Sequence, residues 1–341
     1  METAIGVLNY LSFFGVTAGI FAVLSLGLNV QWGYTGLFNI GIAGFFAIGA
    51  YTSALISGPP PGPVDWRIIG GWGLPFPLGV LGACTVAALV ALGIGFLTLR
   101  LKEDYLAITS IGIAEIIRLV IKNESWLTNG VVGFTNIPSP LRQPILNGVN
   151  GLLSSHPEYP NWLSRLLGNA YIWFYLIFVV LMILVIYLLL ERALHSPWGR
   201  VLRAIREDEV AVAAQGKNVS AFKLQAFVLG ASLMGLAGSL YAHHARYLSV
   251  AKFEPFYGTF IVWVMLVAGG SGNNRGAILG SLFVWGLWAG TDFLTMSLPL
   301  SDTRAAALRV ALIGLLLILV LLLRPRGILG EKRFVSRLLN K

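Results

Sequence analysis

The chain has 341 residues, of which 56% are hydrophobic and 11% charged, and its mean hydropathy is +0.77. Because a soluble domain carries about 25% charged residues, this composition excludes an ordinary water-exposed protein and predicts an all-α, polytopic integral membrane protein. The net charge of +9 does not indicate a nucleic-acid partner, because the basic residues lie in short stretches between apolar segments, where they suit a lipid membrane.

Apolar segments of about 20 residues are long enough to cross the hydrocarbon core of a bilayer. We expect eight to ten crossings, nine being the best number, in a single transmembrane domain over residues 1–341. The first segment has no basic stretch before it, so we expect a span and not a cleaved signal peptide. Segment 105–121 carries charge and segment 257–268 is short, as in a broken or re-entrant helix. The candidates are 5–30, 37–56, 75–98, 105–121, 171–190, 221–241, 257–268, 277–296 and 305–323.

Lysine and arginine are distributed unequally between alternate connections. Fourteen lie in one set of connections, which includes 192–217 and 324–341, and seven lie in the other. The positive-inside rule assigns the richer set to the cytoplasm, so the N-terminus is expected outside and the C-terminus inside. Residues 122–170, which contain five prolines, are then an external cap or irregular loop, and residues 324–341 are a cytoplasmic basic tail.

Residues 195–220 are predicted to form a short amphipathic helix on the cytoplasmic side. Ser196 and Pro197 are typical of a helix start, and Gly216 of a helix end. An apolar stripe is expected from Val201, Ile205 and Val212. Such a helix either rests on lipid or docks into a partner, and the acidic run 207–209 argues against a pure lipid anchor.

This segment resembles the cytoplasmic coupling loop of branched-chain amino-acid permeases of ABC importers, the LivH/LivM type and especially its LivM-like branch. That family has the pattern S-P-x-G-R-x-x-x-A-I-R-x-x-E-x-A-A, followed by a glycine and a lysine. Stretches 31–53, 104–119, 128–138, 265–280 and 323–330 resemble further family motifs in the same order. The matching residues of the loop are Ser196, Pro197, Gly199, Arg200, Ala204, Ile205, Arg206, Glu209, Ala211, Gly216 and Lys223.

The resemblance implies a subunit that carries no ATP-binding machinery of its own. It implies a homologous LivH-like permease partner, two ATP-binding subunits that grip the coupling helices of the two permeases, and an extracytoplasmic substrate-binding protein, all at a bacterial inner membrane. The residues expected to couple to the ATPase are Pro197, Gly199, Arg200, Ala204, Arg206, Glu209 and Gly216. The sequence agrees in lacking a P-loop, because its one Gly-Lys pair, at 216–217, is followed by asparagine. No cofactor is expected on this chain, with ATP and Mg²⁺ on the partner subunits.

Polar residues inside the spans are candidates for the substrate path. Phe38–Asn39 and Gly41–Ile42 stand where the commonest family pattern has Leu-Ser and Gly-His, which makes Asn39 and Gly41 candidates, although a helix–helix hydrogen bond is favoured for Asn39, as for Asn29. Glu115 and Arg118 are three residues apart and so can pair on one helical face. An ion pair is the favoured role, with a position along the permeation path or at the end of a span as alternatives.

Other chemistry is not indicated by the residues. His243 and His244 lie beside Arg246, but no nearby acid or cysteine completes a metal site, so no metal is predicted. No catalytic cluster is evident, so the chain is not expected to be an enzyme. The pairs Gly276–Gly280 and Gly286–Gly290 predict close helix packing, within this subunit or against a partner. The alternatives to amino-acid import are urea import by the same machinery and, more remotely, ion-coupled secondary transport.

Overall fold

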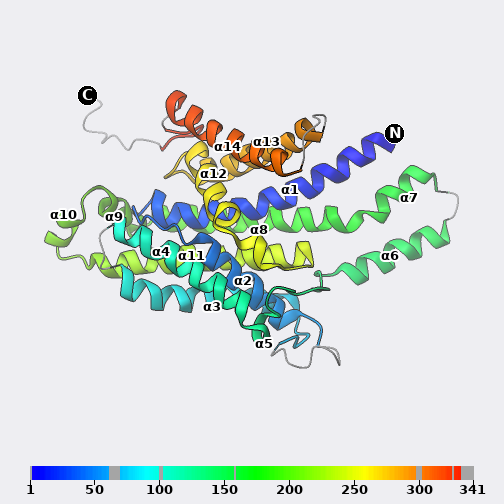
Figure 1. Cartoon of the computed structure of the whole chain (residues 1–341), viewed down its shortest axis with the longest axis horizontal. Helices are drawn as coiled ribbons and strands as arrows, with labels where there is room; N and C mark the ends of the chain where they lie inside the picture. Colours follow the sequence, from blue (N-terminus) through cyan, green and yellow to red (C-terminus); the bar gives the residue numbers. More distant parts are fainter. Residues whose placement is uncertain are drawn as a thin grey trace.

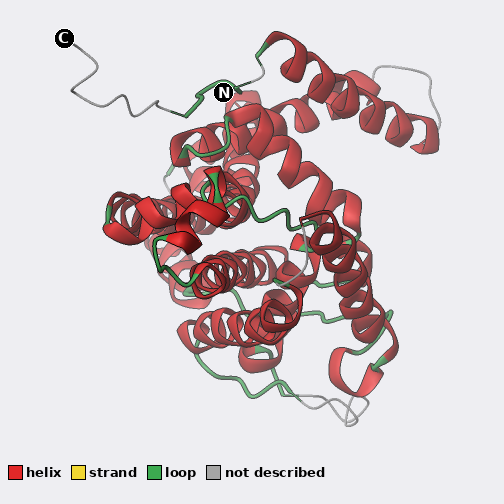
Figure 2. Ribbon diagram, turned by 90° about the vertical axis from the view of Figure 1, so that its left-hand side faces the viewer, coloured by secondary structure: helices red, strands yellow, loops and turns green. Residues whose placement is uncertain are grey.

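A computed structural model describes residues 2–60, 70–99, 103–156, 159–296, 302–324 and 326–331. Within these residues the regular elements are all helical (Figure 2), so the predicted all-α class is confirmed. The elements are α1 (Glu2–Leu28), η1 (Asn29–Gly33), α2 (Ile42–Ser57), α3 (Phe76–Thr98), α4 (Glu103–Asn123), α5 (Ser125–Thr128), α6 (Arg142–Ser155), α7 (Asn161–Gly168), α8 (Ala170–His195), α9 (Pro197–Glu207), α10 (Glu209–Ala214), α11 (Val219–Ala245), η2 (Val250–Phe253), η3 (Phe256–Phe260), α12 (Ile261–Gly269), α13 (Asn274–Met296) and α14 (Asp302–Leu323).

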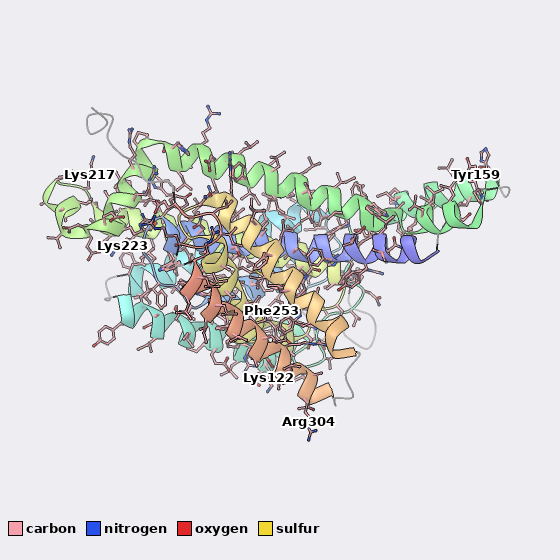
Figure 3. All side chains as sticks on the ribbon, turned by 90° about the horizontal axis from the view of Figure 1, so that it is seen from above. Lys122, Tyr159, Lys217, Lys223, Phe253 and Arg304 are labelled. Carbon is pink, nitrogen blue, oxygen red and sulfur yellow. The ribbon has the colours of Figure 1, made fainter. Side chains whose placement is uncertain are left out.

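Helices α1 and α8 lie roughly along one common axis, horizontal in Figure 1, while α13 and α14 run obliquely to it (Figure 3). Helix α11 packs against α1, α2 and α3, and α1 also packs against α8 and α13. Small residues allow the closest of these contacts. A Cβ atom on Gly49 would lie 2.0 Å from the carbonyl oxygen of Gly235, and one on Gly280 would lie 2.0 Å from that of Met265. The predicted packing of Gly276 and Gly280 is therefore met within this chain, by α12, whereas Gly290 has no neighbour within 4 Å of such an atom.

Each of the nine predicted spans falls on a helix of the described residues. Five helices are long and apolar enough to cross a membrane, and two shorter apolar helices, Ile42–Ser57 and Tyr257–Gly269, accompany them. The chain is thus a multi-pass membrane protein, while the count of nine crossings stays a prediction. The five long helices are Gly6–Gly33, Phe76–Thr98, Ala170–His195, Val219–Ala245 and Thr303–Val320.

The second span begins later than its hydropathy predicted. Residues 37–56 were expected to be helical, but α2 begins at Ile42 and residues 36–41 form an irregular connection after η1. Gly36 adopts a left-handed φ of 78°, and the side chain of Asn39 accepts a hydrogen bond from the backbone N of Gly41 at 2.7 Å. These local turns keep residues 36–41 out of α2, although the residues themselves are apolar enough to belong to a membrane-spanning helix.

The labelled residues of the two sets of connections are separated along the long axis of the molecule, and Lys122 and Arg304 of the second set lie between its two ends. Lys217 and Lys223 lie at one end of the long axis and Tyr159 at the other (Figure 3). The segment predicted as an external cap contains α5, α6 and α7, of which α7 lies toward the Tyr159 end and α5 near the middle of the long axis (Figure 1). An isolated bridge between Phe134 and Leu248 fastens this segment to the chain after α11. This arrangement fits the predicted alternation of sides, and the assignment of the sides stays a prediction.

The histidine pair lies in the last turn of α11. His243 is fully buried, with Nδ1 2.5 Å from the carbonyl oxygen of Pro138 and Nε2 2.9 Å from the hydroxyl of Ser53. A carbonyl can only accept, so Nδ1 carries the proton and Nε2 accepts from the serine. These contacts attach the segment around Pro138 to α2 and α11, so His243 has a structural role.

Candidate functional site

The connection between α8 and α11 is a pair of short helices, not the single helix expected over residues 195–220. Helix α9 ends at Glu207, and the side chain of Asp208 then accepts hydrogen bonds from the backbone N of Val210 at 2.9 Å and of Ala211 at 3.0 Å. Asp208 is thus an N-cap that begins α10. Gly216, with a φ of 76°, follows α10 and not α9, so the expected glycine stop is present one helix later.

The start of α9 is a tight turn that requires glycine. Pro197 occupies its first position, as predicted, and Gly199 is buried two residues later. A Cβ atom at position 199 would lie 2.1 Å from the carbonyl oxygen of Leu194 and 2.4 Å from its Cα. The same carbonyl accepts a hydrogen bond from Arg203 at 2.9 Å. Gly199 therefore sets the angle at which α9 leaves α8.

The α9–α10 segment has a buried apolar face and an exposed polar one. Ile205 and Val212 are buried as expected, but Leu202 takes the place assigned to Val201. Val210 is the exception on the outer face, because 74% of its surface is exposed. The exposed residues that were expected to contact the ATPase are Pro197, Arg200, Ala204, Glu209 and Gly216.

Arg206 is turned inward and joins three parts of the chain. Its guanidinium donates hydrogen bonds to the carbonyl oxygen of Gly33, to Oε2 of Glu331 at 2.8 Å and to Oε1 of Glu207 at 3.1 Å. Only 24% of its side chain is exposed. Burial alone would lower its pKa, but the ion pairs with Glu331 and Glu207 outweigh burial and leave the pKa raised, so the residue stays charged. Arg206 therefore links α9 to the end of η1 and to the segment after α14.

A further ion pair fastens α10 to the following span. Lys223 of α11 pairs with Glu209 of α10, and 16% of the lysine side chain is exposed. Trp198 of α9 donates from Nε1 to the side chain of Gln225 at 2.8 Å. Both contacts bring the α9–α10 segment against the beginning of α11, so the segment is held at both of its ends.

Buried amides hold the break between α1 and α2 in place. Asn29 donates to Oδ1 of Asn274 at 3.0 Å and accepts from the backbone N of Gly272 at 2.9 Å. The side chain of Asn39 donates to Oε1 of Gln31 at 2.8 Å, and Gln31 donates to the carbonyl oxygen of Phe227 at 2.8 Å. Asn29 thus makes the helix–helix bond favoured from the sequence.

Asn39 and Gly41 lie inside the protein, behind the surface of a large groove. Asn39 is fully buried, and its carbonyl oxygen accepts a hydrogen bond from Nε1 of Trp263 at 3.1 Å. A Cβ atom on Gly41 would lie 2.7 Å from the carbonyl oxygen of Ser110, so glycine permits the close approach of α4. Both residues position the backbone that lines the groove.

This groove, which we call the α4–α14 groove, has a volume of about 750 Å³. One side is formed by α4 and another by α14, and η1, the irregular connection 36–41, η3 and α12 lie between them. The elements between α4 and α14 form the floor of the groove, and three aromatic rings cluster there. The ring centroids of Trp32 and Phe38 each lie 4.7 Å from that of Trp263. The residues lining it are Trp32, Phe38, Ile40, Ile111, Ala114, Pro255, Thr259, Phe260, Trp263, Val264, Val267, Ser271, Leu317 and Arg326.

Glu115 and Arg118 form the ion pair favoured from the sequence. Arg118 donates from Nε to Oε2 of Glu115 at 2.8 Å and from Nη2 to Oε1 at 2.5 Å. The side chain of Glu115 is 38% exposed and that of Arg118 is 23% exposed. The pair follows groove-lining Ala114 on α4, but neither residue is among those that line the groove, and the other two candidate path residues, Asn39 and Gly41, lie behind its floor.

Sequence reasoning missed several residues of both regions. The aromatic floor, Glu331 as the partner of Arg206, and exposed Val210 were not predicted. Only Val210 carried a local signal, because it follows three acidic residues and lies off the apolar stripe of its helix. The tail prediction over 324–341 is described only as far as Glu331, and residue 325 and residues 332–341 lie outside the described residues.

Residues 10–321 match the family model described as "Branched-chain amino acid transport system / permease component". The chain belongs to this family. Among curated relatives, the permease is 33% identical to the high-affinity branched-chain amino acid transport system permease protein LivM of Salmonella typhimurium, over 92% of this chain and 68% of that protein. It is 32% identical to LivM of Escherichia coli K12, over 94% and 70%. It is 26% identical to LivH of Escherichia coli K12, over 94% of both chains. No solved structure matches this permease.

Proposed function

We propose that this chain is one half of the membrane pathway of an ATP-driven, binding-protein-dependent importer for branched-chain or other neutral, hydrophobic amino acids in a bacterial inner membrane. The named relatives are branched-chain amino-acid permeases of both the LivM and the LivH kind. Similarity to both kinds supports a pathway in which this chain pairs with a LivH-like sister subunit. The greater identity to LivM supports a LivM-like role for this chain in that pair.

The observation that carries the proposal is the position of Arg206. One of the two ATP-binding subunits would contact the outer face of the α9–α10 segment, where Val210 offers an apolar anchor among charged residues. Movement of α9 would then be transmitted by Arg206 to Gly33. Gly33 ends η1, the segment that also carries Trp32 of the groove floor. An ATPase thus has a route of direct contacts to the groove, which lets ATP binding favour one state of the pathway.

Two alternatives have less support. The named relatives transport branched-chain amino acids, so urea as the cargo is not favoured. An ion-coupled secondary transporter needs carboxylates within the membrane to bind its ion. Glu115, the candidate for that role from the sequence, is engaged by Arg118 through both carboxylate oxygens. An ATP-driven importer therefore remains the best-supported function.

Reconstitution tests this function. The permease, its sister permease, the two ATPases and the binding protein are incorporated into proteoliposomes, and uptake of radiolabelled leucine, alanine and urea is measured with and without ATP. The proposal predicts leucine uptake that requires ATP and the binding protein. Leucine uptake driven by an ion gradient without ATP, or ATP-driven uptake of urea in preference to leucine, would contradict it.

A further inference from the structure

The α4–α14 groove extends along much of the depth of the membrane domain. Its lining runs along η3 and α12 from Pro255 to Ser271. At a rise of about 1.5 Å per helical residue this is roughly 20 Å, compared with a hydrocarbon thickness of about 30 Å. The feature is therefore an elongated track and not a local pocket.

The floor of the groove contains the irregular backbone of the membrane domain. The connection 36–41 and the π-helical turns η1 and η3 all contribute lining residues, among them Trp32, Phe38 and Thr259. Non-helical backbone at membrane depth is tolerated where it is buried in protein or lines a water-filled cavity, and broken helices of this kind form the substrate sites of many transporters. The breaks in α1–α2 and before α12 meet at one surface, which favours a transport path there.

The middle of the groove is apolar, and charged groups lie toward its ends. Arg326, beside Ser271, is the charged residue among those lining it. On α4, Ile111, Ala114 and Arg118 follow one another at helical spacing on one face, so Arg118 continues the lining stripe by one turn. Glu254, next to lining residue Pro255, lies within electrostatic range of Arg118. Acid and base thus stand together at the end of the apolar track.

We infer that the α4–α14 groove is this subunit's side of the passage for the amino acid. The aliphatic side chain of the cargo contacts the surface formed by Trp32, Phe38 and Trp263, while Arg118 receives its carboxylate and Glu254 receives its ammonium group at the mouth. This inference rests on the proposed function and adds the path and the residues that select the cargo.

The match lies in the charge pattern and the size. A branched-chain amino acid carries one positive and one negative group and an apolar side chain, the same three features that follow one another from the mouth into the track. A volume of about 750 Å³ also leaves room for water, at about 30 Å³ per molecule, around the two charged groups. The excess volume suits a path that releases its cargo instead of retaining it.

Cysteine accessibility tests the inference on the complete transporter in proteoliposomes. The single cysteine, Cys84, is first replaced in a Cys84→Ser parent. Ile111→Cys then introduces a thiol on the groove, and Ile116→Cys introduces one on the same helix but off the groove. Both isoleucines are exposed, at 44% and 61%, so neither substitution removes core packing. The probe is a charged, membrane-impermeant methanethiosulfonate reagent added with or without leucine-loaded binding protein.

The expected result is modification at position 111 that slows roughly fivefold when leucine fills the groove about four-fifths of the time, and no leucine effect at position 116. If the thiol at position 111 is as unreactive as a lipid-facing thiol at position 116, lipid occupies the groove. If the thiol at position 111 is modified but leucine does not protect it, the cargo passes elsewhere. Both results overturn the inference while leucine uptake by the parent upholds the proposed function. Absence of leucine uptake by the parent overturns the proposed function and the inference with it.

Discussion

The α9–α10 segment and the α4–α14 groove differ in where they keep their charged residues. In the α9–α10 segment, Arg206 is turned inward between two carboxylates and most of the other charges cover an exposed face. In the groove, an apolar surface is continuous and the charges lie toward its ends. The first arrangement forms specific ion pairs and hydrogen bonds with the rest of the chain. The second offers an amino acid an apolar surface along which it can move. Arg206 and Gly33 connect the two regions, because Arg206 of α9 donates to Gly33 of η1 and η1 also carries Trp32 of the groove floor.

The largest expected effect comes from breaking that connection. In Arg206→Glu a carboxylate would face Glu331 and the carbonyl oxygen of Gly33, which leaves both without a donor. We expect leucine uptake to fall by a factor on the order of 100 while the protein still accumulates in the membrane. Uptake and leucine-stimulated ATP hydrolysis are measured in proteoliposomes.

Arg206→Lys is the matched control for this variant. It keeps the charge but cannot donate to Gly33 and Glu331 in the same fixed geometry, so an intermediate uptake rate is expected. Leucine-stimulated ATP hydrolysis at the parent rate in Arg206→Glu would remove Arg206 from the coupling route.

Two glycines of the α9–α10 segment are required for different reasons: Gly199 because a neighbouring backbone lies close to it, and Gly216 because of its left-handed backbone conformation. Gly199→Ala introduces a Cβ atom 2.1 Å from the carbonyl oxygen of Leu194, so the turn must open. A loss of stability of about 3 kcal/mol is expected. Gly216→Ala meets no atom within 4 Å and strains only a φ of 76°, at a cost of about 1 kcal/mol. Thermal unfolding of the detergent-purified protein ranks the two, and an equal loss in both would show that Leu194 does not restrict position 199.

Exposed Val210 tests contact with the ATPase without disturbing the fold. Val210→Asp is expected to weaken association with the ATP-binding subunits by about 2 kcal/mol, because a carboxylate would be placed in an apolar contact. Co-purification at increasing salt measures this. Val132→Asp is the control, since Val132 is 69% exposed and belongs to the segment predicted on the other side of the membrane from α10. Equal retention of the ATPase by both variants would exclude Val210 from the interface.

The smallest effect is expected within the groove floor. Trp263→Phe keeps an aromatic ring beside Trp32 and Phe38 and removes the hydrogen bond to the carbonyl oxygen of Asn39. The loss of about 1 kcal/mol should raise the KM for leucine by less than roughly tenfold and leave the maximal rate near that of the parent. A loss of maximal rate without a change in KM would assign Trp263 to the conformational change and not to the cargo.

The sequence predicted those features that depend on neighbouring residues. Hydropathy over single segments located the helices, and the spacing of Glu115 and Arg118 predicted their ion pair, because both are properties of a few consecutive turns. Pro197 and Gly216 were found at helix ends for the same reason. Asp208 also carried a capping signal, but the apolar stripe continuing through Ile205 and Val212 favoured one helix over two.

Long-range contacts could not be predicted in this way. Arg206 is separated by 173 residues from Gly33 and by 125 from Glu331, and the groove joins residues from Trp32 to Arg326. Their proximity depends on how α1, α12 and α14 pack, which no single segment encodes. Asn39 shows the same limit, since its polarity within a span suggested either a helix contact or the substrate path, and only the packing reveals its bond to Gln31.

The central claim is that Arg206 transmits movement of α9 to the α4–α14 groove. Pulsed electron paramagnetic resonance between spin labels at Ile111→Cys and Leu317→Cys, in the Cys84→Ser parent of the reconstituted transporter, measures the distance across the groove directly. With Arg206 present, the distance distribution should shift when ATP and vanadate trap the ATPase, and in Arg206→Glu it should stay at its resting value. An equal shift in both proteins would contradict the account.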